Sequence, residues 1–76
     1  MQPATPPWIA AARRAFGDRV RSARIDADLT QDKLAELAGI HRTTLQDTEG
    51  GKTDPKFSLI LRLARALGIP ARDLMP

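Results

Sequence analysis

A glycine interrupts the one stretch of this sequence that otherwise has the pattern of a single amphipathic helix. In TQDKLAELAGIHRTTLQ, the residues Leu34, Leu37 and Ala38 have the i, i+3, i+4 spacing of a buried helical face. Gly39 follows them, and the apolar pattern resumes with Leu45. Glycine adopts the left-handed backbone conformation without the Cβ clash that other residues suffer. Gly39 therefore predicts a tight turn between two short helices.

Cap and breaker residues divide the rest of the chain into helices. Thr30 is an N-cap type, and Asp28 before it is tolerable in a left-handed cap where glycine would be easier. Gly17 costs a helix about 1 kcal/mol relative to alanine, so a break of the first helix at this residue stays open. The predicted helices run from Pro7 to about Ala27, from Gln31 to Ala38, from Arg42 to Thr48 or Glu49, and from Phe57 to Leu67 before Gly68, with a last short turn from Ala71 to Met75.

The two longest predicted helices each have one apolar stripe. No stretch alternates with period two, so we expect an all-α, compact five-helix domain at residues 7–76. The polar, proline-rich residues 1–6 predict a flexible extension. The stripes comprise Trp8, Ala12, Phe16, Val20 and Ala23 in the first helix and Phe57, Ile60, Leu61, Ala64 and Leu67 in the last.

Composition narrows the classes of protein. A chain of 76 residues is one small domain with little room for a catalytic cleft. Its twelve Lys and Arg residues and net charge of +3 suit an anionic partner such as a nucleic acid. Cysteine is absent, which excludes disulfides and zinc ribbons, and no apolar run approaches the roughly 18 residues of a membrane span. We expect a soluble cytoplasmic protein without a cofactor.

Two motifs that would indicate nucleotide binding or catalysis are incomplete in this sequence. The GKT of residues 51–53 lacks the earlier glycine of a phosphate-binding loop, because Gln46 stands there and a helix precedes it. A catalytic triad needs a base, and His41 is the only histidine, with Ser22 and Ser58 on other helices. A metal site would need a cluster of Asp and Glu residues, and the sequence shows no such cluster. The sequence does not indicate an enzyme.

The two short helices and their flanks resemble a known family. The chain is similar to phage-repressor-like (Cro/C1, or XRE) helix-turn-helix regulators from about Phe16 to Leu74. That resemblance implies a lambda-repressor-like fold with a helix-turn-helix at helices 2 and 3, the first bracing on the DNA backbone and the second entering the major groove. The matching residues are Thr30, Gln31, Leu34, Ala35, Leu37, Ala38, Gly39, Ile40, Leu45, Glu49, Gly51, Lys52, Asp54, Pro55 and the run LILRLARALGI.

The resemblance also implies a structural ion pair between Arg24 and Glu49. The alternative is that these are two unrelated surface charges. The sequence departs from the family pattern at two positions. His41 stands where a serine or threonine usually caps the recognition helix, and Thr48 replaces a larger apolar residue.

Four side chains of the predicted recognition helix are candidates for base contact. Arg42 can make two hydrogen bonds to guanine, Gln46 can do the same with adenine, and the Thr43 methyl can pack on thymine. Asp47 can accept from cytosine N4 or exclude wrong bases. By resemblance, Arg42, Thr43 and Asp47 match base-reading positions. Two alternatives stay open: Arg42 contacts phosphate, and Gln46 is a solvated surface residue.

A second group of residues is predicted to contact DNA phosphates. Gln31 begins the second helix, where its side chain and the unpaired amides of the first turn face a phosphate in the family's docking mode. Lys52 and Lys56 lie in the loop after the recognition helix. Thr44 and His41 complete the group, with the alternative that His41 caps its helix.

The predicted partner is double-stranded DNA. One reading helix contacts too few bases to be selective, so we expect a homodimeric transcriptional regulator at the nucleoid, on a two-fold symmetric operator with half-sites about 34 Å apart. Family dimers often join through the last helix, here Leu74 and Met75, although Trp8 could serve instead. The alternative is an antitoxin or accessory subunit that binds another protein through Trp8, unless Trp8 packs on its own core. The HRTTL run is similar to restriction-modification controller proteins.

Overall fold

The computed structural model describes residues 4–76, and every regular element within that range is helical. The all-α prediction is therefore confirmed. The fifth element differs from a full helix, because the residues after Pro70 form only a single 3-10 turn. The elements are α1 (Pro7–Asp26), α2 (Gln31–Ala38), α3 (Arg42–Glu49), α4 (Phe57–Leu67) and the 3-10 helix η1 (Ala71–Leu74).

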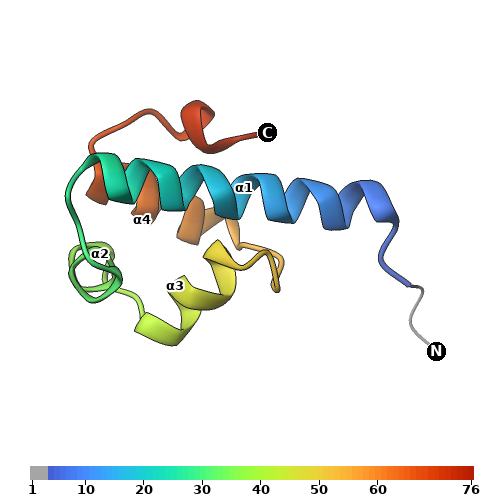
Figure 1. Ribbon diagram of the computed structural model, residues 1–76, viewed down its shortest axis with the longest axis horizontal. Helices are drawn as coiled ribbons and strands as arrows, with labels where there is room; N and C mark the ends of the chain where they lie inside the picture. The colour runs from blue at the N-terminus through green and yellow to red at the C-terminus, as the bar shows by residue number, and fades with distance from the viewer. Residues whose placement is uncertain (1–3) are drawn as a thin grey trace.

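The long helix α1 organises the fold. Helix α3 packs on one side of α1 and η1 on the other, while α4 lies behind α1 and contacts both α2 and η1 (Figure 1). A single apolar core fills the space between them. Its buried members are Phe16, Val20, Leu34, Ala35, Ala38, Leu45, Leu63, Ala64 and Leu74.

A left-handed residue follows each of the four α-helices, either directly after the last helical residue or one residue later. Gly39 has a φ of 69°, and the Ile40 amide beyond it donates to the Ala35 carbonyl at 3.0 Å. Gly68 closes α4 in the same way, and Asp28 with a φ of 58° closes α1. Each closure satisfies carbonyls that the helix end would leave unpaired. Gly39 thus reverses the chain between α2 and α3 in three residues.

Replacing Asp28 by glycine should stabilise the protein. The Asp28 backbone is left-handed, which strains a residue with a Cβ and costs glycine nothing sterically. We expect the free energy of unfolding to rise by about 0.5 to 1 kcal/mol, measured by urea denaturation. The control is Ala11→Gly in the exposed face of α1, which should lower it by about 1 kcal/mol. A decrease in the free energy of unfolding for both variants would contradict the explanation that the left-handed backbone of Asp28 is strained.

Several expectations about the apolar stripes were wrong. Trp8 is 72% exposed and Phe57 is 75% exposed, and Leu37 and Leu61 are also exposed. Trp8 therefore does not pack on its own core. Both aromatic residues lie in the first turn of their helices, and the start of α1 extends beyond the helices that cover its middle (Figure 1). The stripes are wider than the surfaces that neighbouring helices cover.

Two further predictions concern the N-terminal part of the chain: the extension before α1 and a possible break at Gly17. Residues 1–3 of the predicted extension lie outside the described residues, while Ala4, Thr5 and Pro6 are exposed and precede α1. Helix α1 passes through Gly17 without a break. None of the helices in residues 4–76 is long and apolar enough to cross a membrane.

Candidate nucleic-acid interface

The outward face of α3 carries the side chains that the sequence predicts for base contact. Arg42, Thr43 and Gln46 are exposed, whereas Leu45 on the opposite face is fully buried in the core. Asp47 is half-buried, and it lines a hollow of about 410 Å³ together with residues of the following loop. The structure thus brings Arg42, Thr43 and Gln46 onto one open surface and puts Asp47 at its edge.

Arg42 is not isolated on this surface, because Asp32 of α2 lies beside it. The Arg42 Nε atom is 3.3 Å from Asp32 Oδ1, and both side chains are largely exposed. An exposed pair of this kind adds less than about 1 kcal/mol to stability. The pair joins α2 and α3 across the turn between them. Asp32 was not predicted, since its only signal in the sequence is a carboxylate in a first helical turn, which the helix dipole favours anyway.

A buried polar network fastens the end of α3 to α1 and α2. Arg24 donates from Nε to Glu49 Oε2 at 2.7 Å and from Nη2 to Glu49 Oε1 at 3.1 Å. Its Nη1 donates to the Leu29 carbonyl at 2.9 Å, and Gln31 donates its amide to Glu49 Oε1 at 3.1 Å. The side chains of Arg24 and Glu49 are 13% and 5% exposed. Arg24 and Glu49 are therefore paired as the resemblance implies, and the Gln31 amide has an internal partner.

Gly17 sets the distance between α1 and α3. A Cβ atom at this position would meet the carbonyl oxygens of Thr48 and Glu49, the latter at 2.7 Å. The two helices consequently touch backbone to backbone, an approach that only a residue without a side chain permits. Gly17 lowers the helix propensity of α1, but in the fold it allows α1 and α3 to approach closely.

The loop between α3 and α4 is hydrogen-bonded to the end of α3 and to α1. Gly51 has a φ of 68°, and the Lys52 amide after it donates to a carbonyl of the last turn of α3 at 2.9 Å. Farther on, Arg13 Nε donates to Asp54 Oδ1 at 2.9 Å, and this hydrogen bond lowers the pKa of the Asp54 carboxyl below its ordinary value. The exposed side chains of Lys52 and Lys56 project from this loop, on either side of Asp54.

Comparison with known proteins identifies this arrangement. A family described as a helix-turn-helix domain matches residues 15–75. Control protein C.BamHI of Bacillus amyloliquefaciens is 34% identical over 64 residues, which are 83% of this chain and 79% of that protein. The chain belongs to the phage-repressor-like helix-turn-helix family.

Two other helix-turn-helix proteins are similar to this chain, one in sequence and one in solved structure. The cryptic phage CTXphi transcriptional repressor RstR of Vibrio cholerae is 30% identical over 60 residues, which are 79% of this chain and 54% of that protein. The crystal structure of the restriction-modification controller protein C.AhdI from Aeromonas hydrophila superposes with a TM-score of 0.84 and 37% identity, over 86% of this chain and 98% of that one.

Two departures from the helix-turn-helix family pattern have local consequences. His41 occupies the N-cap position of α3, but its side chain accepts no capping hydrogen bond, whereas the Thr30 hydroxyl accepts from the Lys33 amide at 3.0 Å in α2. The first amides of α3 are therefore available to an external acceptor. Thr48 is buried, and its hydroxyl donates to the Thr44 carbonyl at 2.8 Å, so this small polar residue is satisfied within α3.

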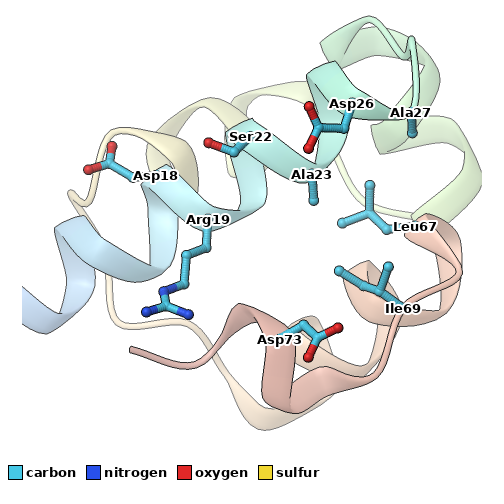
Figure 2. A pocket seen from close by; sticks show the side chains of 9 residues that line it. All are labelled: Asp18, Arg19, Ser22, Ala23, Asp26, Ala27, Leu67, Ile69 and Asp73. Carbon is cyan, nitrogen blue, oxygen red and sulfur yellow. The ribbon is translucent and has the colours of Figure 1, made fainter.

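The opposite side of α1 has the wrong charge for a nucleic acid. A hollow of about 540 Å³ there is lined by Asp18 and Asp26 of α1 and by Asp73 of η1, with Arg19 among them (Figure 2). Three carboxylates against one guanidinium repel phosphate. This face of α1 is therefore unfavourable for phosphate groups.

Proposed function

We propose that this protein binds double-stranded DNA in a sequence-specific manner, as a dimeric transcriptional regulator. In this proposal α2 and α3 are the helix-turn-helix, with α3 in the major groove. The observation that carries the proposal is the open surface of Arg42, Thr43 and Gln46 on a helix whose inner face is fixed to the core. Several relatives are named transcriptional repressors or regulators, which supports the same class of function.

Base contacts and phosphate contacts divide between two groups of residues in this proposal. Arg42, Thr43, Gln46 and Asp47 read base edges, with Asp47 limited to the margin of the groove because it is half-buried. The phosphate contacts come from Gln31, His41, Thr44, Lys52 and Lys56. The Gln31 side-chain amide has two N–H donors, one of which donates to Glu49, so the second N–H would donate to the phosphate. The uncapped start of α3 favours a phosphate at His41.

A dimer on a two-fold symmetric operator completes the proposal. Leu74 is fully buried within the chain and is not available for an interface, whereas Met75 and Trp8 are exposed. Half-sites about 34 Å apart would place both copies of α3 on one face of the duplex. Residues 7–76 act as the single folded domain, and the protein works at the nucleoid in the cytoplasm.

Selection of bound fragments from random duplex DNA tests the function. We expect a two-fold symmetric consensus, and recovery of no sequence preference would contradict the proposal. A footprint on the selected duplex then reports whether two half-sites are occupied.

Alanine variants at Arg42 and Lys52 should affect binding differently. Arg42→Ala should lower affinity for the selected duplex by about 1 to 3 kcal/mol and relax the preference at one base pair, because a bidentate contact to guanine is lost. Lys52→Ala should weaken all duplexes alike, because a phosphate contact has no sequence preference. Titrations against single-base variants of the duplex measure both effects. Equal loss on every sequence for Arg42→Ala would reassign that residue to phosphate.

A second candidate function is that of an antitoxin or accessory subunit whose main partner is a protein. The observation that favours it is Trp8, a large aromatic residue that is exposed on a part of α1 outside the family match. Purification of the protein from its native source separates the candidates. A stoichiometric protein partner that masks Arg42 would favour the second.

A further inference from the structure

A polar hollow lies between α1, the start of α2 and one side of α3. Its volume is about 410 Å³. The hollow borders both Gln31, a proposed phosphate contact, and Gln46, a proposed base contact, so a DNA strand that meets both side chains must pass over it. It is lined by Arg21, Arg24, Gln31, Gln46, Glu49 and Gly50.

On the floor of this hollow, the Arg24 and Glu49 charges balance each other and most of the side-chain donors are paired. Arg24 uses Nε and Nη2 on the Glu49 carboxylate and Nη1 on the Leu29 carbonyl. Gln31 uses its amide on the same carboxylate. An anion that enters the hollow therefore finds the Arg24 charge already balanced by Glu49 and three of the five N–H donors of Arg24 in use.

Arg21 is the cation that this arrangement leaves free. Its side chain is exposed, and no carboxylate of residues 4–76 lies within ion-pair distance of it. The Arg24 and Glu49 charges cancel, so the hollow carries one net positive charge, on Arg21. Gly17 lies one helical turn before Arg21 and holds α1 against the end of α3, which keeps this guanidinium beside the reading helix.

We propose that Arg21 binds a phosphate of the DNA strand that crosses this hollow, so that α1 itself contributes to the DNA-binding surface. The inference rests on the proposed DNA-binding function and adds to it a contact from outside the two short helices. A guanidinium is suited to this role because it donates two parallel hydrogen bonds to phosphate oxygens.

Arg19 provides a matched control in the same helix. It is also exposed, but it lies two residues away, which turns it nearly to the opposite side of α1. Figure 2 shows Arg19 on the acidic hollow near Asp73, away from α3. Arg19→Gln and Arg21→Gln remove the same charge from the same helix, so long-range electrostatics change almost equally and only the local contact differs.

The experiment measures the affinity of both variants and the unaltered protein over a range of salt concentrations. The probes are the duplex selected from random DNA and a scrambled duplex of equal length. For Arg21→Gln we expect the slope of log K against log salt to become shallower by about 0.9, the value for one phosphate. At 0.1 M salt this corresponds to about eightfold weaker binding on both duplexes. Arg19→Gln should leave the slope unchanged, and Arg21→Lys should retain most of it.

Each outcome decides one question. An unchanged slope for Arg21→Gln, or an equal decrease for Arg19→Gln, would overturn the assignment while leaving DNA binding intact. Far-UV circular dichroism of the variants checks that the helices are retained. Failure of the unaltered protein to bind any duplex would instead overturn the DNA-binding function on which the inference rests.

Discussion

Replacement of Gly17 by alanine should lower the free energy of unfolding by about 3 kcal/mol. A Cβ atom there would overlap the carbonyl oxygens of Thr48 and Glu49, and these are backbone atoms that can move only if the whole end of α3 moves. Overpacking of this kind costs 1 to 3 kcal/mol, and the rigid neighbours put this site at the upper end. Helix propensity alone predicts the opposite, a gain of about 1 kcal/mol. Urea denaturation followed by circular dichroism measures the change.

Gly50→Ala is the control for this prediction. Gly50 has an ordinary helical backbone, with a φ of −81°. A Cβ atom there would meet the Gln46 carbonyl at 3.3 Å and the flexible Lys52 side chain at 3.6 Å, so small shifts can accommodate it. Its stability should change by less than about 1 kcal/mol. Similar losses for both variants would show that backbone contact between α1 and α3 is not the cause.

Glu49→Leu should destabilise the protein by about 3 kcal/mol. The substitution leaves the Arg24 guanidinium without its carboxylate in a site where the arginine side chain is only 13% exposed, and it also removes the partner of Gln31. Removal of one partner from a buried ion pair costs about 3 to 5 kcal/mol, and the residual exposure of Arg24 favours the lower value. Thermal and urea unfolding of the variant measure the loss.

The double variant Arg24→Met with Glu49→Leu distinguishes ion-pair loss from packing loss. Apolar replacement of both partners can be nearly neutral, because no uncompensated charge remains. We expect the double variant to recover a large part of the stability that Glu49→Leu loses. A double variant as unstable as the single one would show that the shape of Glu49, rather than its charge, fastens α3.

The parts of the fold that depend on local backbone conformation could be predicted from the sequence. Gly39 and Gly68 end their helices because the left-handed conformation is a property of the residue itself, and Thr30 caps α2 for the same local reason. The apolar spacing likewise located α4. Leu37 is exposed although it has the spacing of a buried residue, because the spacing does not say how wide an arc the neighbouring helices cover.

Features that depend on a distant neighbour could not be predicted from local sequence patterns, and the Arg24–Glu49 pair was expected only from the family resemblance. Gly17 needs the end of α3, which lies 31 and 32 residues further along at Thr48 and Glu49, before its role is visible. The pairing of Arg42 with Asp32 likewise exists only once the turn has brought α2 and α3 together. The sequence predicted which residues lie on the outward face of α3, but it did not predict the contact of Arg42 with Asp32.

The two faces of α3 have consequences for how such a protein can change over time. Leu45, Thr48 and Glu49 hold the helix, while Gln46 takes no part in holding it and Arg42 contributes only an exposed ion pair with Asp32. Surface substitutions away from buried contacts usually alter stability by no more than about 0.5 kcal/mol. Under the proposed function, new operator preferences would therefore arise by mutation at the outward positions alone. Duplicated copies of this gene could diverge to separate targets, and an engineer could retarget the scaffold, without redesigning its core.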